Sequence, residues 1–187
     1  RGIYSRVFEI EHENLRKTRD ANSDPAIEEA VKEIIRAQRI GVIGFRSSHS
    51  VSYLIYFLLG QIRKNCTLLE CRDGSLPNQI IHYGRGDLLI CFSLPRYSRE
   101  TLTVLRQAKK NGCRTMAITD RRISPIGRIA DIVLLVSNQT STYFNSLTSA
   151  VALVNCLVAG VALNDRHAID TLKKVNQVVN EWQYLLM

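Results

Sequence analysis

Residues 40–50 read IGVIGFRSSHS, and this stretch decides the fold. Its first six residues form an apolar run without polar alternation, which is typical of a strand buried on both faces. A short Ser-rich loop follows, and then a second apolar stretch, at 50–63, that has the length of a helix. A buried strand that passes through a polar loop into a helix begins a βαβ unit, which predicts a parallel sheet.

The same alternation recurs along the rest of the chain. Strands are predicted at 40–45, 67–71, 88–93, 115–119 and 132–136, and helices between them at 50–63, 76–83, 99–111 and 124–130. A charged lead helix at 3–19 and a helix that begins at Asp24-Pro25 precede them, and helices at 142–163 and 166–186 follow. The expected fold is therefore an α/β three-layer sandwich with a five-stranded parallel sheet. We expect a helical lead at 1–23 and one domain at 24–187.

The charge of the chain is unevenly placed. Its 187 residues include 25 Lys and Arg against 17 Asp and Glu, a formal net charge of +8. Such an excess suits a nucleic-acid partner, an anionic membrane surface or a small anionic ligand. Many arginines stand in short loops between apolar runs and not along one helix, which favours a small anion. These are Arg46, Arg72, Arg85, Arg96, Arg121 and Arg122.

The cysteines predict neither a disulfide framework nor a metal site. They are odd in number, form no C-x-x-C pair and lie in or beside apolar stretches, at Cys66, Cys71, Cys91, Cys113 and Cys156. We expect buried thiols of a reduced, cytoplasmic protein without metal or cofactor. The longest apolar stretch, 147–163, carries Thr148, Ser149 and Asn155, which favours a buried helix over a membrane span.

Two loops are candidate ligand sites, because ligands of open parallel sheets bind outside the carboxyl ends of the strands. The loops at 44–50 and 93–101 each combine hydroxyls, arginine and a helix N-terminus, which together attract an anion. The candidate ligand-binding residues are Arg46, Ser47, Ser48, Ser93, Arg96 and Ser98. The alternative is that Ser48, Ser50 and Ser98 only cap helices, and that Arg96 and Arg99 form a solvated pair. The occurrence of two such loops after two central strands favours the anion site.

Several stretches taken together resemble the sugar isomerase (SIS) domain, a flavodoxin-like phosphosugar-binding fold. They are GFRSSH at 44–49, SLPRYSRET at 93–101, AKKNG at 108–112, ITD at 118–120, SP at 124–125 and AD at 130–131. The segment EHENLRKT at 11–18 is similar to the one that precedes this domain in RpiR-type transcriptional regulators. In those proteins an N-terminal helix-turn-helix domain binds DNA and the SIS domain senses a metabolite. The resemblance implies an effector-sensing domain whose DNA-binding domain lies outside this sequence.

The resemblance also implies that Ser47, Ser48, Ser93 and Ser98 contact a phosphate. The sequence departs from the family pattern at two glycines, which are replaced here by Arg46 and Arg96. In the second loop, Pro95 and Ser98 also stand where the pattern has Ser and Thr. Because arginine binds phosphate or carboxylate bidentately, a sugar acid would suit this loop pair as well as a phosphosugar.

The alternative function is a phosphosugar aldose–ketose isomerase, which needs a general base and an acid. The candidates are His49, His82, His167, Glu70 and Glu100. Only His49 stands beside a candidate loop, and no Glu/His pair matches the catalytic set of isomerases of this fold. The residues therefore favour a protein that is not an enzyme.

The predicted partners are a small anionic metabolite and a second copy of the chain. The 142–163 helix carries small residues that permit close helix approach: Ala150, Ala152, Ala159, Gly160 and Ala162. The alternative is that this helix only covers the sheet of its own subunit. The family resemblance favours a homodimer or larger assembly, because palindromic operators demand two-fold symmetry. We expect no membrane partner, and contact with DNA only through the domain outside this sequence.

Overall fold

The computed structural model describes residues 2–71 and 74–182. The predicted strands form one all-parallel sheet in the order β2-β1-β3-β4-β5. The strands are β1 (Ile40–Gly44), β2 (Cys66–Leu68), β3 (Leu88–Phe92), β4 (Arg114–Thr119) and β5 (Ile132–Leu135). From β1 the chain passes to β2 on one side, and from β2 it crosses back to β3 on the other side of β1. The strand order therefore reverses between β1 and β3, and a crevice is expected at their carboxyl ends.

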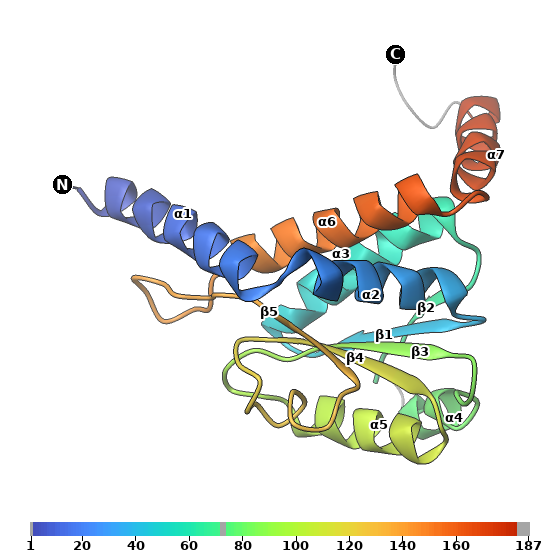
Figure 1. The fold of residues 1–187 in the computed structure, drawn as a ribbon, viewed down its shortest axis with the longest axis horizontal. Coiled ribbons are helices and arrows are strands. Elements are labelled where there is room, and N and C mark those ends of the chain that lie inside the picture. Colours follow the sequence, from blue (N-terminus) through green and yellow to red (C-terminus); the bar gives the residue numbers. More distant parts are fainter. Residues whose placement is uncertain (1, 72–73, 183–187) are drawn as a thin grey trace.

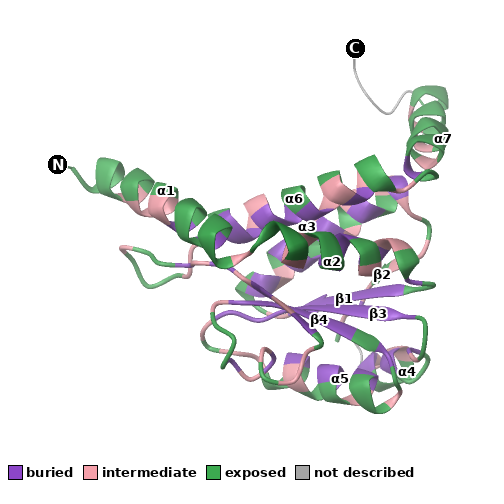
Figure 2. Cartoon of the chain, in the orientation of Figure 1, coloured by how far each residue is buried: buried purple, intermediate pink, exposed green. Residues whose placement is uncertain are grey.

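Helices cover both faces of the sheet, which confirms the three-layer prediction (Figure 1). On one face lie α2 (Asp24–Arg36), α3 (Ser47–Ile62) and α6 (Thr148–Asn164), and on the other lie α4 (Leu76–Ile80) and α5 (Arg99–Lys110). Each face has its own core, because successive side chains of a strand point to opposite faces. Ile90 of β3 belongs to the first core, and its neighbour Leu89 belongs to the second. Figure 2 shows burial concentrated in the strands and on the inward sides of the helices.

The first and last helices extend from opposite ends of this body (Figure 1). Helix α1 (Ile3–Ala21) contacts α6 and β5, and α7 (Ala168–Glu181) contacts α3 and α6. The apolar side chains of α1 are only partly covered: Val7 and Ile10 are half-buried, whereas Ile3 and Leu15 are exposed. Within the described residues no single helix is long and apolar enough to cross a bilayer; only α6 and α7 together, bent by 105°, have the necessary length and composition.

Several predicted helices differ from the structure at their ends by up to a few residues, and two differ more strongly. Residues 124–130 form consecutive turns instead of a helix, and the helix predicted at 142–163 begins only at Thr148. Hydroxyl side chains explain the late start, because they bond to nearby backbone groups and compete with a helix. Thr140 Oγ1 accepts from the N–H of Thr142, and Ser146 Oγ accepts from the N–H of Thr148. The predicted helix end at 183–186 and Arg72 lie outside the described residues.

The cysteines are all free, but only part of the burial prediction is correct. Cys91 and Cys113 are buried and Cys66 is half-buried, and burial raises the pKa of the Cys113 and Cys66 thiols to about 12. Cys71 and Cys156 are exposed, against expectation. Cys71 lies beyond the end of β2, and Cys156 lies on a side of α6 that neither the sheet nor a neighbouring helix covers.

Candidate functional site

A cavity of about 230 Å³ opens beyond the carboxyl ends of β1 and β3, where the strand order reverses. Its lining includes all six residues predicted from the two loops: Arg46, Ser47, Ser48, Ser93, Arg96 and Ser98. Phe45, Leu94, Pro95, Phe144 and Asn145 complete it. Among the described residues, no carboxylate or histidine lines this cavity, so its charge is positive.

The two arginines of the cavity have an unusual backbone. Arg46 has φ 56° and Arg96 has φ 66°, and within the described chain they are the only non-glycine residues with positive φ. An L-residue in this region costs about 1–2 kcal/mol relative to glycine, because Cβ crowds the following carbonyl. These positions correspond to the glycines of the family pattern. The chain therefore keeps two guanidinium groups at the cavity despite a conformational cost.

Close packing holds the first loop against helix α3. A Cβ on Gly44 would lie 2.3 Å from Ser52 Oγ and 2.8 Å from the Ser48 carbonyl oxygen. Ser52 Oγ donates to that carbonyl at 2.9 Å. Only glycine permits β1 to end so close to α3. The N-terminus of α3 has no side-chain cap, so the capping alternative is wrong for Ser48 and Ser50, which lie inside the helix.

In the second loop, Ser98 caps helix α5 and also lines the cavity. Its Oγ accepts from the N–H of Thr101 at 3.2 Å and donates to Glu100 Oε2 at 2.6 Å. The bond from Ser98 lowers the pKa of Glu100. Ser98 thus lines the cavity while its hydroxyl already has two partners. A bound anion would have to replace the bond to Glu100 to receive a hydrogen bond from Ser98.

Ser93 is the unsatisfied polar group of the cavity. The residue is 3% exposed, and its Oγ has no hydrogen-bond partner among the described residues. Its carbonyl oxygen accepts from Thr119 Oγ1 at 2.7 Å, which ties the end of β3 to β4. A buried hydroxyl without a partner costs about 1–3 kcal/mol, so an orphan of this kind calls for an explanation such as a missing ligand.

A loop from a distant part of the sequence closes one side of the cavity. Arg96 Nη2 donates to the carbonyl oxygen of Tyr143 at 2.9 Å, and Asn145 Nδ2 donates to that of Pro95 at 3.1 Å. Phe144 and Asn145 reach the lining from this loop. These two residues were not among the predicted site residues, because the sequence pattern predicts a helix from residue 142. The run of Ser, Thr, Asn and Gln at 137–146 was the signal that could have identified a loop.

The acid–base candidates lie outside this lining. His49 Nε2 lies 3.9 Å from Glu70 Oε1, a pair formed by the first turn of α3 and the segment after β2. Glu100 bonds to Ser98, His82 follows α4, and His167 precedes α7. The structure therefore joins one Glu/His pair near the site, which the sequence analysis did not anticipate.

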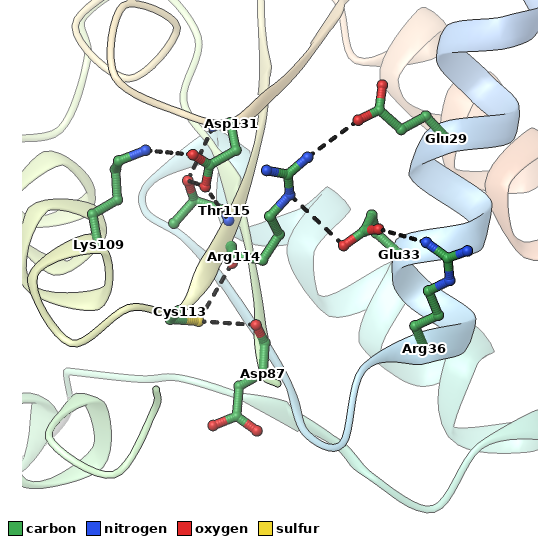
Figure 3. A network of polar contacts seen from close by, with 9 residues as sticks. All are labelled: Glu29, Glu33, Arg36, Asp87, Lys109, Cys113, Arg114, Thr115 and Asp131. Carbon is green, nitrogen blue, oxygen red and sulfur yellow. Dashed lines mark hydrogen bonds and ion pairs between the residues drawn. The ribbon is translucent and has the colours of Figure 1, made fainter. Parts of the chain in front are cut away.

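A second hollow, of about 420 Å³, lies at the opposite end of the strands, beside the starts of β3, β4 and β5. Its charged residues have a structural explanation. Figure 3 shows ion pairs between several of its charged side chains: Glu33 with Arg36 and Arg114, and Lys109 with Asp131. Arg114 lies 3.2 Å from Glu29 and 3.7 Å from Glu33, and Lys109 Nζ lies 2.5 Å from Asp131. Asp131 also accepts from the N–H and the hydroxyl of Thr115. These contacts fix the start of β4 and β5, so the charges of this hollow have a structural role.

Comparisons with known proteins agree with this architecture. Residues 33–160 match the SIS domain family, and the chain belongs to that family. The sugar isomerase domain of an RpiR transcription factor from Sphaerobacter thermophilus is 31% identical, with a TM-score of 0.90 over 95% of this chain and 99% of that one. The Vibrio vulnificus NanR protein complexed with ManNAc-6P is 20% identical, with a TM-score of 0.83 over 97% of this chain and 70% of that one.

A curated relative extends the comparison. An uncharacterized HTH-type transcriptional regulator from Caldanaerobacter subterraneus subsp. tengcongensis is 23% identical over 80% of this chain. The aligned part is 51% of that regulator, so the chain corresponds to about half of its length. A phosphoheptose isomerase from Francisella tularensis, 17% identical with a TM-score of 0.73 over 86% of this chain and 97% of that one, shares the fold as well. The likeness therefore includes both regulators and enzymes, with the 31% identical relative among the regulators.

Proposed function

We propose that this chain is the effector-sensing domain of an RpiR-type transcriptional regulator. In this proposal the cavity between β1 and β3 binds a phosphosugar or a related sugar acid, and a helix-turn-helix domain outside this sequence binds DNA. The observation that carries the proposal is the pairing of two arginines with the unpartnered Ser93 hydroxyl in one cavity that lacks carboxylates among its described residues. The ManNAc-6P complex of NanR supports the choice of ligand class.

The proposed contacts with the ligand are of two kinds, charge-assisted bonds from arginines and hydrogen bonds from serines. Arg46 and Arg96 hold the anionic group through charge-assisted bonds, and Ser47, Ser48 and Ser93 donate to its oxygens. The N-terminus of α3 adds the positive end of a helix dipole, and Ser98 contributes if it releases Glu100. Calorimetry with a panel of phosphosugars and sugar acids tests this assignment. Binding that is unchanged in both Arg46→Ala and Arg96→Ala would contradict it.

The second candidate, an isomerase, is favoured by the His49–Glu70 pair and by the fold shared with phosphosugar isomerases. Against it stands the lining itself, in which none of the described residues is a suitable general base. The two functions differ in turnover. A sensor binds its phosphosugar and leaves it unchanged, whereas an isomerase converts it in a time course followed by NMR.

We further propose that residues 1–23 link the DNA-binding domain to a ligand-binding domain at 24–187, and that the chain forms a cytoplasmic homodimer. Part of α6 is occupied within the subunit, since a Cβ on Gly160 would lie 2.6 Å from Val31 of α2. The support for a dimer is therefore the symmetry that operators require. Light scattering at micromolar concentration tests it, and a monomer mass would count against it.

A further inference from the structure

Helix α1 and its C-cap residue Asn22 bond to the end of β5 and to the chain that follows it, in a way that resembles strand pairing. Asn22 Nδ2 donates to the Leu135 carbonyl at 2.7 Å, and its Oδ1 accepts from the Leu135 N–H at 2.8 Å. Asn14 makes the same two bonds with Gln139, at 2.8 and 3.0 Å. Between them, Thr18 Oγ1 accepts from the N–H of Ser137 at 2.8 Å. We call Asn14, Thr18 and Asn22 the α1 ladder.

The spacing of the ladder follows from backbone geometry. Four residues of an α-helix rise about 6 Å, and two residues of an extended chain rise about 6.6 Å. Side chains at i, i+4 and i+8 of a helix can therefore meet every second residue of an antiparallel extended segment. Asn14 is fully buried and Thr18 is 6% exposed, although most of α1 is open to solvent. The α1 ladder therefore satisfies backbone groups that would otherwise be unpaired at the sheet edge.

The segment that the ladder holds leads directly into the ligand cavity. Ser137 and Gln139 bond to α1, and a few residues later Tyr143 and Asn145 bond to Arg96 and Pro95. Glu11 of α1 reaches the same segment, because it accepts from Ser146 Oγ at 2.5 Å. The loop at 137–147 is thus attached to α1 on one side and to the cavity on the other.

We infer that Asn14, Thr18 and Asn22 are positioning residues for the ligand site, and that α1 senses the occupancy of the cavity through the 137–147 loop. An anion bound to Arg96 competes with the Tyr143 carbonyl for the guanidinium. The bond between Arg96 and the Tyr143 carbonyl, which fixes the loop over the cavity, is then replaced by a bond to the anion. The positions of the loop and of α1 change together as a result. This inference rests on the proposed function for the identity of the anion site, and the ladder itself is a feature of the described structure.

Amide exchange measured by NMR tests the coupling without any ligand. Arg96→Ala removes the bond to Tyr143, and we expect the N–H groups of Ser137 and Gln139 to exchange about three- to tenfold faster, as for the loss of a net hydrogen bond. Arg99→Ala is the control, because Arg99 is exposed and outside the cavity lining. Equal exchange rates in wild type and Arg96→Ala would overturn the inference.

The reciprocal experiment starts from the helix. Asn14→Ala should weaken binding of inorganic phosphate about threefold or more, although Asn14 is absent from the cavity lining. Asn65→Ala is matched, since Asn65 Nδ2 donates to the carbonyls of Ala37 and Gln38 at the far edge of the sheet. It should lose stability without losing affinity. If Asn14→Ala and Asn65→Ala bound phosphate with equal affinity, the inference would be overturned. A wild type that binds neither phosphate nor any phosphosugar would refute the proposed function, and the exchange experiment would then decide the coupling.

Discussion

Arg46 and Arg96 follow two neighbouring strands, line the same cavity and both have positive φ, of 56° and 66°. Since neither residue is glycine, each adopts a backbone that disfavours its own Cβ. Strain of this kind persists where the surrounding structure enforces it, and it gathers at functional sites. Two properties of these residues can be tested separately: the guanidinium, which we propose binds the ligand, and the positive φ, which lowers stability.

The first prediction separates these properties by comparing Arg46→Gly with Arg46→Ala. Both remove the guanidinium, but only glycine relieves the strain at φ 56°. We expect the glycine variant to be more stable than the alanine variant by about 1 kcal/mol in urea unfolding. Both should lose anion affinity to the same extent. If the alanine variant were the more stable of the two, the positive φ would not be a source of strain.

The second prediction concerns charge selectivity. Charge-assisted hydrogen bonds contribute about 1.5–3 kcal/mol each, so Arg96→Ala should weaken binding of the preferred ligand about tenfold or more. Because no carboxylate is among the described residues of the lining, its net positive charge should also favour a ligand that carries a second anionic group. In calorimetry 6-phosphogluconate should therefore bind more tightly than glucose 6-phosphate, and Arg96→Ala should reduce the difference. Equal affinities for the two compounds in the wild type would argue for a single anion contact.

The third prediction concerns the orphan hydroxyl of Ser93. Ser93→Ala removes a buried group that has no partner in the described chain, so the free protein should keep its stability or gain about 1 kcal/mol. The same change should weaken anion binding, because it removes a donor from the lining. Thermal unfolding and calorimetry on one sample measure both effects. A stability loss with normal affinity would mean that Ser93 serves the fold and not the ligand.

The fourth prediction concerns acid stability. Burial by itself raises the pKa of Asp131, but the bonds from Lys109 and Thr115 outweigh it and lower that pKa below its ordinary value. A carboxyl group with a lowered folded-state pKa stabilises the fold fully above its unfolded pKa of about 3.9. This contribution is lost as the pH falls through the folded-state value.

The midpoint temperature of thermal unfolding should therefore decrease when the pH is lowered below about 4. In Asp131→Asn this decrease should be smaller. Asp87 acts in the same direction: burial raises its pKa, and the bonds from Arg39 and the Gly84 N–H lower it further than burial raises it. The Asp131 variant should thus keep part of the acid sensitivity. An identical acid dependence in wild type and variant would exclude Asp131 as its source.

The sequence predicts the sheet and the cavity because both depend on local patterns. Apolar runs identify the strands. Because ligands of parallel sheets bind at the carboxyl ends of the strands, the loops after β1 and β3 are expected to lie together there. The six residues chosen from those loops indeed line one cavity. Their role in ligand binding stays a prediction until binding is measured.

The missed features depend on contacts between distant segments. Phe144 and Asn145 reach the cavity only because the 137–147 loop bonds to Arg96, Pro95 and helix α1. Nothing in the α1 sequence alone indicates that its Asn and Thr residues pair with Leu135, Ser137 and Gln139. The stripe that anchors α1 is polar, and two of its residues, Asn14 and Thr18, are buried.

The most direct test of the proposed function is phosphorus NMR of a phosphosugar mixture that includes ManNAc-6P, recorded with the wild type and with an Arg46→Ala, Arg96→Ala double variant. The wild type should broaden the resonance of at least one compound, and no new resonance should appear over hours. The double variant should broaden none. Conversion of a phosphosugar would show an enzyme in place of a sensor. Broadening that is equal with the double variant would show that the cavity between β1 and β3 is not the binding site.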